Sequence, residues 1–223
     1  MQKNRTIIVT EDGSKTIYFP DIEENYHSTH GALQESRHIF IQNGLEFFRN
    51  QPSVNIFEIG FGTGLNALLS VQFAVENQIS MHYDSIEAFP ISREEAEALN
   101  YGSLFSEKWQ NLSLEIHDFP WNESIAVNEY FQLTKIFHAL ETWSLPTNFY
   151  DCIFFDAFSP RVQNELWTPS IFQNMFNSLK LGGLLTTYCA KGQVKRDLKS
   201  AGFDVENVPG PPGKREMTLA WKR

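Results

Sequence analysis

The feature that most constrains this chain is a short apolar segment that runs into three closely spaced glycines and then into a helical pattern. Residues 54–60 read VNIFEIG, the glycines are Gly60, Gly62 and Gly64, and residues 64–77 carry apolar side chains nearly all round a helix. Glycine lets the backbone turn sharply and approach a ligand closely, and the following helix offers unpaired N–H groups at its first turn. This order predicts a buried strand, a ligand-binding turn and a helix, with a tight turn that binds nothing as the plainer alternative.

Strand and helix patterns continue to alternate after this turn. Further strands are predicted at 81–88, 112–117, 130–137, 150–157, 184–190, 203–208 and 216–222. Further helices are predicted at 92–100, 168–180 and 191–201. Strands separated by helices indicate an α/β fold with a mostly parallel sheet and helices on both faces. Ligands of such sheets bind at the carboxyl ends of the strands, so the chemistry is expected there.

The first fifty residues have a different pattern. Asp12 and Gly13 lie between two short apolar stretches, 5–10 and 16–19, which predicts a hairpin. Residues 31–49 then carry apolar side chains at helical spacing. We therefore expect an amino-terminal extension over residues 1–50, packed on a main domain over residues 51–223.

Composition excludes several classes of protein. Hydrophobic residues make up 42% of the 223 positions, including 19 Phe and 5 Trp, which argues against disorder. Two cysteines make neither a disulfide framework nor a four-cysteine zinc site. There is no apolar run long enough to span a membrane, and the first residues lack the apolar core of a signal peptide. We expect a cytoplasmic globular protein without a membrane segment.

The net charge of -9 is unevenly distributed. Residues 191–223 contain eight basic and four acidic side chains, whereas residues 1–190 contain ten basic and 23 acidic ones. Solvated helix faces explain many such imbalances. The more specific hypothesis is a patch for an anionic ligand on an otherwise acidic body.

Two acidic residues accompany the glycines. Glu58 precedes Gly60 by two residues, and Glu87 ends the next predicted strand, 23 residues after Gly64. An acid about 20 residues beyond a glycine loop is where a nucleoside ribose is held, because a carboxylate accepts hydrogen bonds from its hydroxyls. The alternative for Glu87 is a strand end that faces solvent.

Asp156 follows the strongly apolar strand pattern of residues 150–155. A carboxylate there is costly to bury unless it lies at the strand tip and faces a cleft. Ala157, Phe158, Ser159 and Pro160 come next. An acid beside an aromatic side chain and a rigid turn is suited to hold an amine nucleophile, and a turn-capping role is the alternative.

Other candidates for chemistry are weaker. His27 and His30 offer two metal ligands, but no third stands at a diagnostic spacing, so we expect no metal site. Cys152 and Cys189 fall inside predicted buried strands, where inert thiols are the usual finding.

Five motifs in order resemble the methyltransferase domain of the MnmC family, bacterial enzymes that modify the wobble uridine of tRNA. They are Tyr26–Phe40 (YHSTHGALQESRHIF), Phe61–Asn66 (FGTGLN), Glu87–Pro90 (EAFP), Phe155–Pro160 (FDAFSP) with Trp167 and Thr168, and residues 192–202 with Lys214–Met217 (KREM). The resemblance spans nearly the whole chain, and five ordered matches are more specific than one glycine loop.

The resemblance implies a class I, Rossmann-like methyltransferase fold with a mostly parallel seven-stranded sheet and an amino-terminal extension. It implies methyl transfer from S-adenosyl-L-methionine to the amine of 5-aminomethyl(-2-thio)uridine at the wobble position of tRNA. In two-domain relatives, a flavin oxidoreductase domain follows and makes that amine. Because this sequence stops at Arg223, no FAD is expected in it. A separate flavin oxidoreductase, or another precursor-forming enzyme, is then the expected partner beside tRNA.

The motifs and the resemblance together give roles to individual residues. Asp156 is expected to be catalytic, because it would orient the amine. The candidates for cofactor binding are Glu58, Gly60, Gly62, Gly64, Asn66, Glu87 and Glu141. The candidates for substrate binding are Tyr26, Glu35, Phe158, Ser159, Pro160, Lys214 and Arg215.

One stretch departs from the family pattern. A Gly-Asp pair usually follows the third core strand, and its Asp accepts a hydrogen bond from the adenine amino group; here residues 137–141 read FHALE. Glu141 or a backbone carbonyl would have to substitute. Two alternatives stay open at this point. One is methyl or aminopropyl transfer to a small-molecule amine, which the acidic body favours. The other is a catalytically silent S-adenosyl-L-methionine-binding protein.

Overall fold

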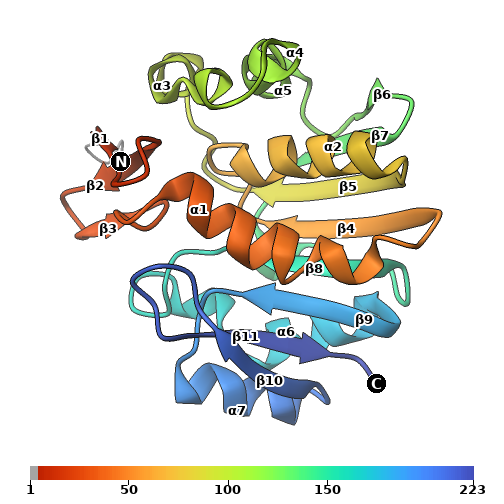
Figure 1. Ribbon diagram of the computed structural model, residues 1–223. Helices are drawn as coiled ribbons and strands as arrows, with labels where there is room; N and C mark the ends of the chain where they lie inside the picture. The colour runs from red at the N-terminus through yellow and green to blue at the C-terminus, as the bar shows by residue number, and fades with distance from the viewer. Residues whose placement is uncertain (1–4) are drawn as a thin grey trace.

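A computed structural model describes residues 5–223 and shows a central eight-stranded sheet in the order β10-β11-β9-β8-β4-β5-β7-β6 (Figure 1). Its strands are β4 (Ser53–Ile59), β5 (Ser80–Glu87), β6 (Ser124–Asn128), β7 (Phe131–Phe137), β8 (Tyr150–Phe155), β9 (Leu179–Thr187), β10 (Asp204–Pro209) and β11 (Glu216–Trp221). The predicted α/β class is confirmed. Within the described residues the sheet has one strand more than the seven expected, because β6 adds an antiparallel edge to β7.

The middle of this sheet is parallel, as predicted. Strand β4 pairs in parallel with both β5 and β8, β5 pairs with β7, and β8 pairs with β9. The chain runs outward from β4 through β5 to β7, and then returns to β8 on the other side of β4. A reversal of strand order leaves a crevice beyond the carboxyl ends of the strands that flank it. The site is therefore expected beyond the ends of β4 and β8.

Helices cover both faces of the sheet because alternate strand residues point to opposite sides. Ile56 belongs to the apolar cluster that includes the side chains of α2, whereas its neighbour Phe57 belongs to the cluster that includes those of α6 and α7. Figure 1 shows α1 and α2 running along one face. The helices concerned are α1 (Ala32–Ser36), η1 (Arg37–Gln42) and α2 (Leu65–Asn77) on that side, and α6 (Pro169–Ser178) and α7 (Gly192–Ser200) on the other.

The amino-terminal segment folds into a small three-stranded sheet of β1 (Thr6–Val9), β2 (Lys15–Phe19) and β3 (Glu24–Asn25). The hairpin predicted at Asp12 and Gly13 is confirmed. The Asp12 carboxylate accepts hydrogen bonds from the backbone N–H of Ser14 (3.0 Å) and of Gln34 (3.0 Å), so the hairpin is tied to the first turn of α1. This tie brings residues 19–35 to the end of the sheet where the crevice lies.

The helical pattern over 31–49 is split into three short pieces. After α1 the chain makes the π-helical turn η1, and then the 3-10 turn η2 (Leu45–Phe48). Gly44 separates the last two pieces, and a Cβ there would clash with the carbonyl oxygen of Phe40. The Phe40 ring packs on Phe154 of β8 at 5.0 Å between centroids, which fixes the segment on the sheet.

The strand prediction for 112–117 is wrong, because this segment is the helix α5 (Leu112–Asp118). Alternating apolar residues over so short a stretch fit either structure, and tertiary contacts decide between them. Ser113 and Ile116 face the interior with helical spacing. The helix predicted at 92–100 begins with a capping box formed by Ser92 and Glu95. The other short elements of this region are α3 (Arg93–Leu99), η3 (Tyr101–Leu104) and α4 (Glu107–Gln110).

The end predicted for the helix at 168–180 is two residues too late. Helix α6 ends at Ser178, and β9 begins directly at Leu179, which is buried and pairs with Tyr150. Glycine commonly follows the end of a helix, but burial of Leu179 beside β8 ends this helix before Gly182 and Gly183 are reached, and both lie inside β9. No helix within residues 5–223 has the length and apolarity needed to cross a bilayer.

Candidate functional site

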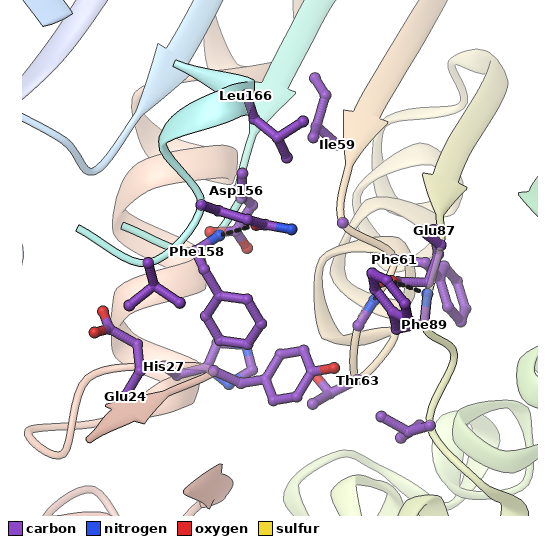
Figure 2. A pocket seen from close by; sticks show the side chains of 18 of the residues that line it. Glu24, His27, Ile59, Phe61, Thr63, Glu87, Phe89, Asp156, Phe158 and Leu166 are labelled. Carbon is purple, nitrogen blue, oxygen red and sulfur yellow. Dashed lines mark hydrogen bonds between the residues drawn. The ribbon is translucent and has the colours of Figure 1, made fainter. Parts of the chain in front are cut away.

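A cavity of about 1190 Å³ opens at the carboxyl ends of β4, β5, β7 and β8. Ligand pockets commonly measure roughly 300–1,000 Å³, so this one has room for two ligands. Figure 2 shows Glu87 and Phe89 on one side of it, and Asp156 and Phe158 on the other. We call the wall formed by Gly60, Gly62 and Glu87 the glycine-loop side. The wall formed by Tyr26, Glu35, Asp156, Phe158 and Lys214 is the aromatic side.

The backbone of the glycine loop adopts conformations that favour glycine. Gly60, Gly62 and Gly64 have φ angles of 91°, 50° and 72°. A Cβ at Gly62 would lie 2.9 Å from the Tyr26 ring, so the loop approaches the opposite wall closely. Gly60 and Gly62 line the cavity, whereas Gly64 precedes α2 and faces Ile116 outside it.

Glu87 holds the glycine loop in place from the end of β5. Its two carboxylate oxygens accept hydrogen bonds from the backbone N–H of Gly62 (3.0 Å) and of Phe89 (2.8 Å). Burial raises the pKa of Glu87. The backbone N–H of Ala88 also acts on this carboxylate, so three of its four lone-pair positions are used and one is left for a ligand hydroxyl.

Glu58 lies beneath the cavity rather than in its wall. The side chain is fully buried, and its Oε2 accepts a hydrogen bond from the Ser85 hydroxyl at 2.5 Å. Burial raises the pKa of Glu58 to about 8. The prediction of direct cofactor contact does not fit this position, because the residue is not among those that line the cavity.

Asp156 lies where the strand order reverses, next to Gly60. Its backbone N–H donates to the carbonyl of Ile59 (3.2 Å), and its Oδ2 accepts a hydrogen bond from the Asn66 amide (2.8 Å). Burial, and then the nearby charge of Glu35, raises the pKa of Asp156 well above its usual range. A raised pKa makes the carboxylate a better proton acceptor, which suits acid–base work.

Three rings form a wall next to Asp156. The rings of Tyr26, Phe158 and Phe19 are mutually in contact, with centroid separations of 5.1 to 5.4 Å. The indole N–H of Trp167 donates to the Phe158 carbonyl (2.8 Å) and so fixes the turn. Ser159, like Pro160 after it, belongs to this turn but does not line the cavity.

Glu35 and Lys214 meet in the cavity wall although they are far apart in sequence. The Lys214 ammonium lies 2.6 Å from Glu35 Oε1 and 4.1 Å from the centre of the Tyr188 ring. The other Glu35 oxygen accepts a hydrogen bond from the Ser28 backbone N–H (2.6 Å). Lys214 therefore has an internal partner, while a third of its side chain stays exposed.

Arg215 lies outside the cavity, in a shallow groove that it shares with Lys191. Its side chain is 95% exposed, and the carboxylate of Glu216 comes no closer than 3.9 Å. The groove adjoins the cavity, since Tyr188 and Lys214 line both. Sequence reasoning missed Tyr188, although its place just beyond the end of β9 was a usable signal.

The stretch that departs from the family pattern also lines the cavity. Residues 138–141 contribute to its wall, and Glu141 lies in the 3-10 turn η4 (Leu140–Thr142) with an exposed side chain. A second 3-10 turn, η5 (Asn164–Leu166), lies in contact with it. The exposed ring of Phe89 and the end of β5 complete this side.

The two histidines considered as metal ligands lie in different surroundings. His27 is buried against Thr16, and burial lowers its pKa to about 4. His30 is exposed and pairs with Glu11. Cys152 and Cys189 are buried thiols, as expected.

Comparisons with known proteins agree with this geometry. A family model described as S-adenosyl-L-methionine-dependent methyltransferase matches residues 100–223. The bifunctional protein MnmC of Cupriavidus metallidurans, named for tRNA 5-methylaminomethyl-2-thiouridine biosynthesis, is 32% identical over 96% of this chain. The protein of the same name from Burkholderia thailandensis is 31% identical over 96% of it. The chain spans about a third of the length of these relatives.

Solved structures show the same fold. The MnmC2 structure from Aquifex aeolicus superposes with a TM-score of 0.81 at 23% identity, covering 100% of this chain and 71% of that one. Spermidine synthase from Thermotoga maritima follows with a TM-score of 0.55 at 13% identity, covering 99% of this chain and 73% of that one. Because the family model covers more than half of the sequence, this chain belongs to the S-adenosyl-L-methionine-dependent methyltransferases.

Proposed function

We propose that this chain transfers a methyl group from S-adenosyl-L-methionine to the amine of 5-aminomethyl(-2-thio)uridine at the wobble position of tRNA. The observation that carries the proposal is Asp156, a carboxyl with a raised pKa beside an aromatic wall, in a cavity with room for two ligands. The names of the MnmC relatives support this choice of acceptor.

The glycine-loop side fits the cofactor. Gly60 and Gly62, whose positive φ angles favour glycine, put no side chain into the cavity, and Glu87 offers carboxylate oxygens for ribose hydroxyls. Glu141 or the backbone of residues 138–141 would contact the adenine. When bound, S-adenosyl-L-methionine supplies an electrophilic methyl group on a cationic sulfur, and the carboxylates of the wall suit that charge.

Asp156 would prepare the amine for attack. An amine attacks only through a free lone pair, so an ammonium substrate must first lose a proton. Asp156 is placed to accept that proton or a hydrogen bond and to aim the lone pair at the methyl carbon. The nitrogen–carbon bond then forms as the carbon–sulfur bond breaks, and the electron pair of that bond stays on sulfur.

The aromatic side would hold the base. A wobble nucleotide lies in a single-stranded loop, and unstacked bases of RNA commonly stack on aromatic side chains. Tyr26 and Phe158 provide such a surface within the wall that contains Asp156. Glu35 and Ser28 would keep the wall in shape through their hydrogen bond.

The groove of Lys191 and Arg215 would contact phosphates of the same RNA strand. It adjoins the cavity, and both side chains are exposed. Of the basic residues near the carboxyl end, Lys214 is held by Glu35 and Lys195 by Glu216, so the structure supports only part of the patch predicted from sequence. Exposed cations beside a base-binding pocket suit nucleic acid, whose affinity rests largely on phosphate contacts.

The test is methyl incorporation from labelled cofactor into tRNA that carries the aminomethyl group but lacks the methyl group. We expect incorporation at the wobble nucleoside and none into spermidine or other small amines. Small-amine methylation would favour the alternative acceptor, which the acidic wall allows but the relatives do not favour. Binding without turnover on every acceptor would indicate a silent protein.

The proposal also implies a supply of precursor. We propose that a flavin oxidoreductase, or another enzyme that makes the aminomethyl group, acts before this chain. Because the proposed acceptor is tRNA, we also propose that the reaction takes place in the cytoplasm.

A further inference from the structure

A buried lysine lies beside the glycine loop. Lys135 of β7 is 1% exposed, and its ammonium donates a hydrogen bond to the backbone carbonyl of His117 (2.8 Å). The acid that acts on it, Asp118, forms its salt bridge with Arg93 instead, so the ammonium has no counter-ion of its own among the described residues. Burial lowers the pKa of Lys135 to about 8. A buried ion without a counter-ion is costly, so its presence here needs an explanation.

Two aromatic rings complete the surroundings of this ammonium. The nitrogen of Lys135 lies 4.6 Å from the centre of the Trp121 ring and 5.4 Å from the centre of the Phe61 ring. The two rings also contact each other, with their centroids 5.9 Å apart. A cation is attracted to the face of an aromatic ring, most strongly where water is excluded. The ammonium therefore holds the Phe61 ring in place beside β7.

His117 contacts the same loop through its ring. The centroid of that ring lies 5.4 Å from that of Phe61, and its Nε2 lies 3.1 Å from the carbonyl oxygen of Thr63. Burial lowers the pKa of His117 to about 4, so the ring is neutral and carries one nitrogen-bound hydrogen at neutral pH. A carbonyl oxygen can only accept, so this hydrogen is on Nε2 and is donated to Thr63. The hydrogen bond of Lys135 to the His117 carbonyl fixes the residue that makes this contact.

The two supported residues are the ones that carry side chains in the glycine loop, which reads GFGTG over residues 60–64. Phe61 and Thr63 both line the cavity (Figure 2). Three glycines in five positions give the backbone many conformations of similar energy, so contacts from outside the loop must impose its shape. Glu87 fixes the N–H of Gly62. The lysine and the histidine act on the residues directly before and after that N–H.

We propose that Lys135 is a positioning residue for the cofactor: its buried ammonium holds Phe61 and the end of α5, so that the glycine loop keeps the shape that binds S-adenosyl-L-methionine. His117 transmits the same support to Thr63. Without this support the loop adopts other conformations, and the apparent affinity falls in proportion to the fraction that stays competent to bind. The role concerns the cofactor, so it does not depend on which amine is methylated.

The first test is calorimetric titration of wild type and Lys135→Met with S-adenosyl-L-homocysteine, the demethylated cofactor. Methionine fills a similar volume but has neither charge nor donor. We expect the affinity to fall about tenfold, as for a loop that is competent about a tenth of the time. The melting temperature of the free protein should change by only a few degrees, because loss of a buried charge offsets the lost contacts. A merely structural residue would show the reverse, lower stability with unchanged affinity.

Lys222→Met is the matched control. Lys222 makes the same kinds of contact, since its ammonium donates to the carbonyl of Leu179 (2.7 Å) and lies 5.0 Å from the centre of the Phe176 ring. None of these three residues lines the cavity. The affinity for S-adenosyl-L-homocysteine should therefore be unchanged in this variant. An equal fall in both variants would overturn the proposal.

A double-mutant cycle tests the route through the aromatic ring. Phe61→Leu removes the ring that the ammonium holds. If the two side chains act as a unit, the variant with both substitutions binds S-adenosyl-L-homocysteine about as weakly as the weaker single variant. Losses that simply multiply would show that Lys135 does not act through Phe61, and would overturn the proposal.

The pH dependence of the same affinity gives an independent measurement. The ionisable groups around the ammonium are His117 and Asp118 of α5, and Arg93, which pairs with Asp118. In the wild type the affinity should fall as the pH rises above 8, because the ammonium loses its proton and with it the attraction to the rings. Glu58 also has a pKa of about 8, but it titrates in both proteins. The fall should therefore be steeper in wild type than in Lys135→Met, and equal profiles would contradict the proposal.

If Lys135→Met does not fold, Lys135→Gln takes its place in each measurement. Glutamine has an N–H to donate but no charge, so the affinity for S-adenosyl-L-homocysteine should again fall. An unchanged affinity in that variant, or a wild-type affinity that is constant from pH 7 to pH 9, would overturn the proposal. Failure of the wild type to methylate tRNA would refute the proposed acceptor and leave these binding results unaffected.

Discussion

The two sides of the cavity are built in different ways. On the glycine-loop side, Gly62 and Glu87 lie 25 positions apart and are joined by a hydrogen bond between adjacent strand ends. On the aromatic side, Glu35 and Lys214 lie 179 positions apart and meet in a salt bridge. The first side is a local product of one strand–loop–helix–strand unit. The second exists only when the amino-terminal segment, the end of β8 and the loop before β11 come together.

This difference shows which parts of the site carry general and which carry specific chemistry. A glycine loop and an acidic strand end can hold many nucleoside ligands, and they constitute a recurrent unit. The aromatic side has no such recurrent plan, and it contains the residues that we propose for the acceptor. The substitutions below separate the two sides, from the largest expected effect to the smallest.

Asp156→Ala should show the largest effect, confined to the aromatic side. Loss of a positioning or acid–base group lowers kcat by roughly 10²-fold or more. Affinity for S-adenosyl-L-methionine should stay within a few-fold, because the glycine-loop side is untouched. Raising the pH should help the mutant more than the wild type, since bulk solvent then removes the amine proton. Steady-state kinetics would measure kcat, and calorimetry would measure the affinity for S-adenosyl-L-methionine. Normal turnover, or a loss wholly due to failed cofactor binding, would refute a role of Asp156 in orienting the amine.

Gly62→Ala should affect the glycine-loop side instead. The residue has a φ of 50°, which strains a residue with a side chain, and the new Cβ would lie 2.9 Å from the Tyr26 ring, so the loop or the ring must move. We expect affinity for the cofactor and its demethylated product to fall about tenfold or more, given a strain of about 1–2 kcal/mol. The melting-temperature shift produced by saturating product measures the loss, and NADH should produce no shift with either protein.

Gly182→Ala is the matched control for this substitution. Gly182 also has a positive φ, 82°, but a Cβ there meets nothing within 4 Å. The control should lower stability through backbone strain and leave the ligand-induced shift intact. Equal losses of that shift in both variants would mean that strain alone, and not the approach to Tyr26, explains the effect.

Lys214→Met should reveal how far the aromatic side depends on its long-range salt bridge. Glu35 is buried and would lose the partner of one oxygen. Because the Lys214 side chain is a third exposed, we expect only about 1–2 kcal/mol of lost stability. Urea unfolding measures this free energy. Lys199→Met, on the exposed surface of α7, should lower the free energy of unfolding far less. Equal losses in the two variants would show that the salt bridge contributes no more stability than an ordinary surface lysine.

Lys191→Ala and Arg215→Ala should have the smallest effect, visible mainly in the salt dependence of tRNA binding. Each lost phosphate contact lowers the slope of log affinity against log salt by about 1. Arg223→Ala is the control, because Arg223 pairs with Asp204 and Glu206 at the other end of β11. An unchanged slope in the first two variants would show that the groove is only a solvated face.

Much of the fold could be predicted because local patterns and neighbour interactions agree over most of the chain. The strand of β4, the glycine turn and helix α2 follow from residues adjacent in sequence, and so does the hairpin at Asp12 and Gly13. The segment 112–117 could not be assigned, since a short alternating pattern fits a strand or a helix equally well. The choice of a helix depends on tertiary packing, in which Ile116 lies beside Gly64. The eighth strand, β6, likewise forms only because β7 offers an open edge.

The residues of the site also divide into those placed by local sequence and those placed by contacts between distant segments. Residue order alone placed Gly60, Gly62 and Glu87 at adjacent strand ends, because a parallel strand–loop–helix–strand unit leaves few other arrangements. Residue order alone could not show that Lys214 is neutralised by Glu35, that Arg215 stays outside the cavity, or that Glu58 lies beneath it. Those facts depend on which surfaces become buried against each other, and burial is a property of the assembled chain, because contacts between distant segments determine both the solvent and the charges that each side chain meets.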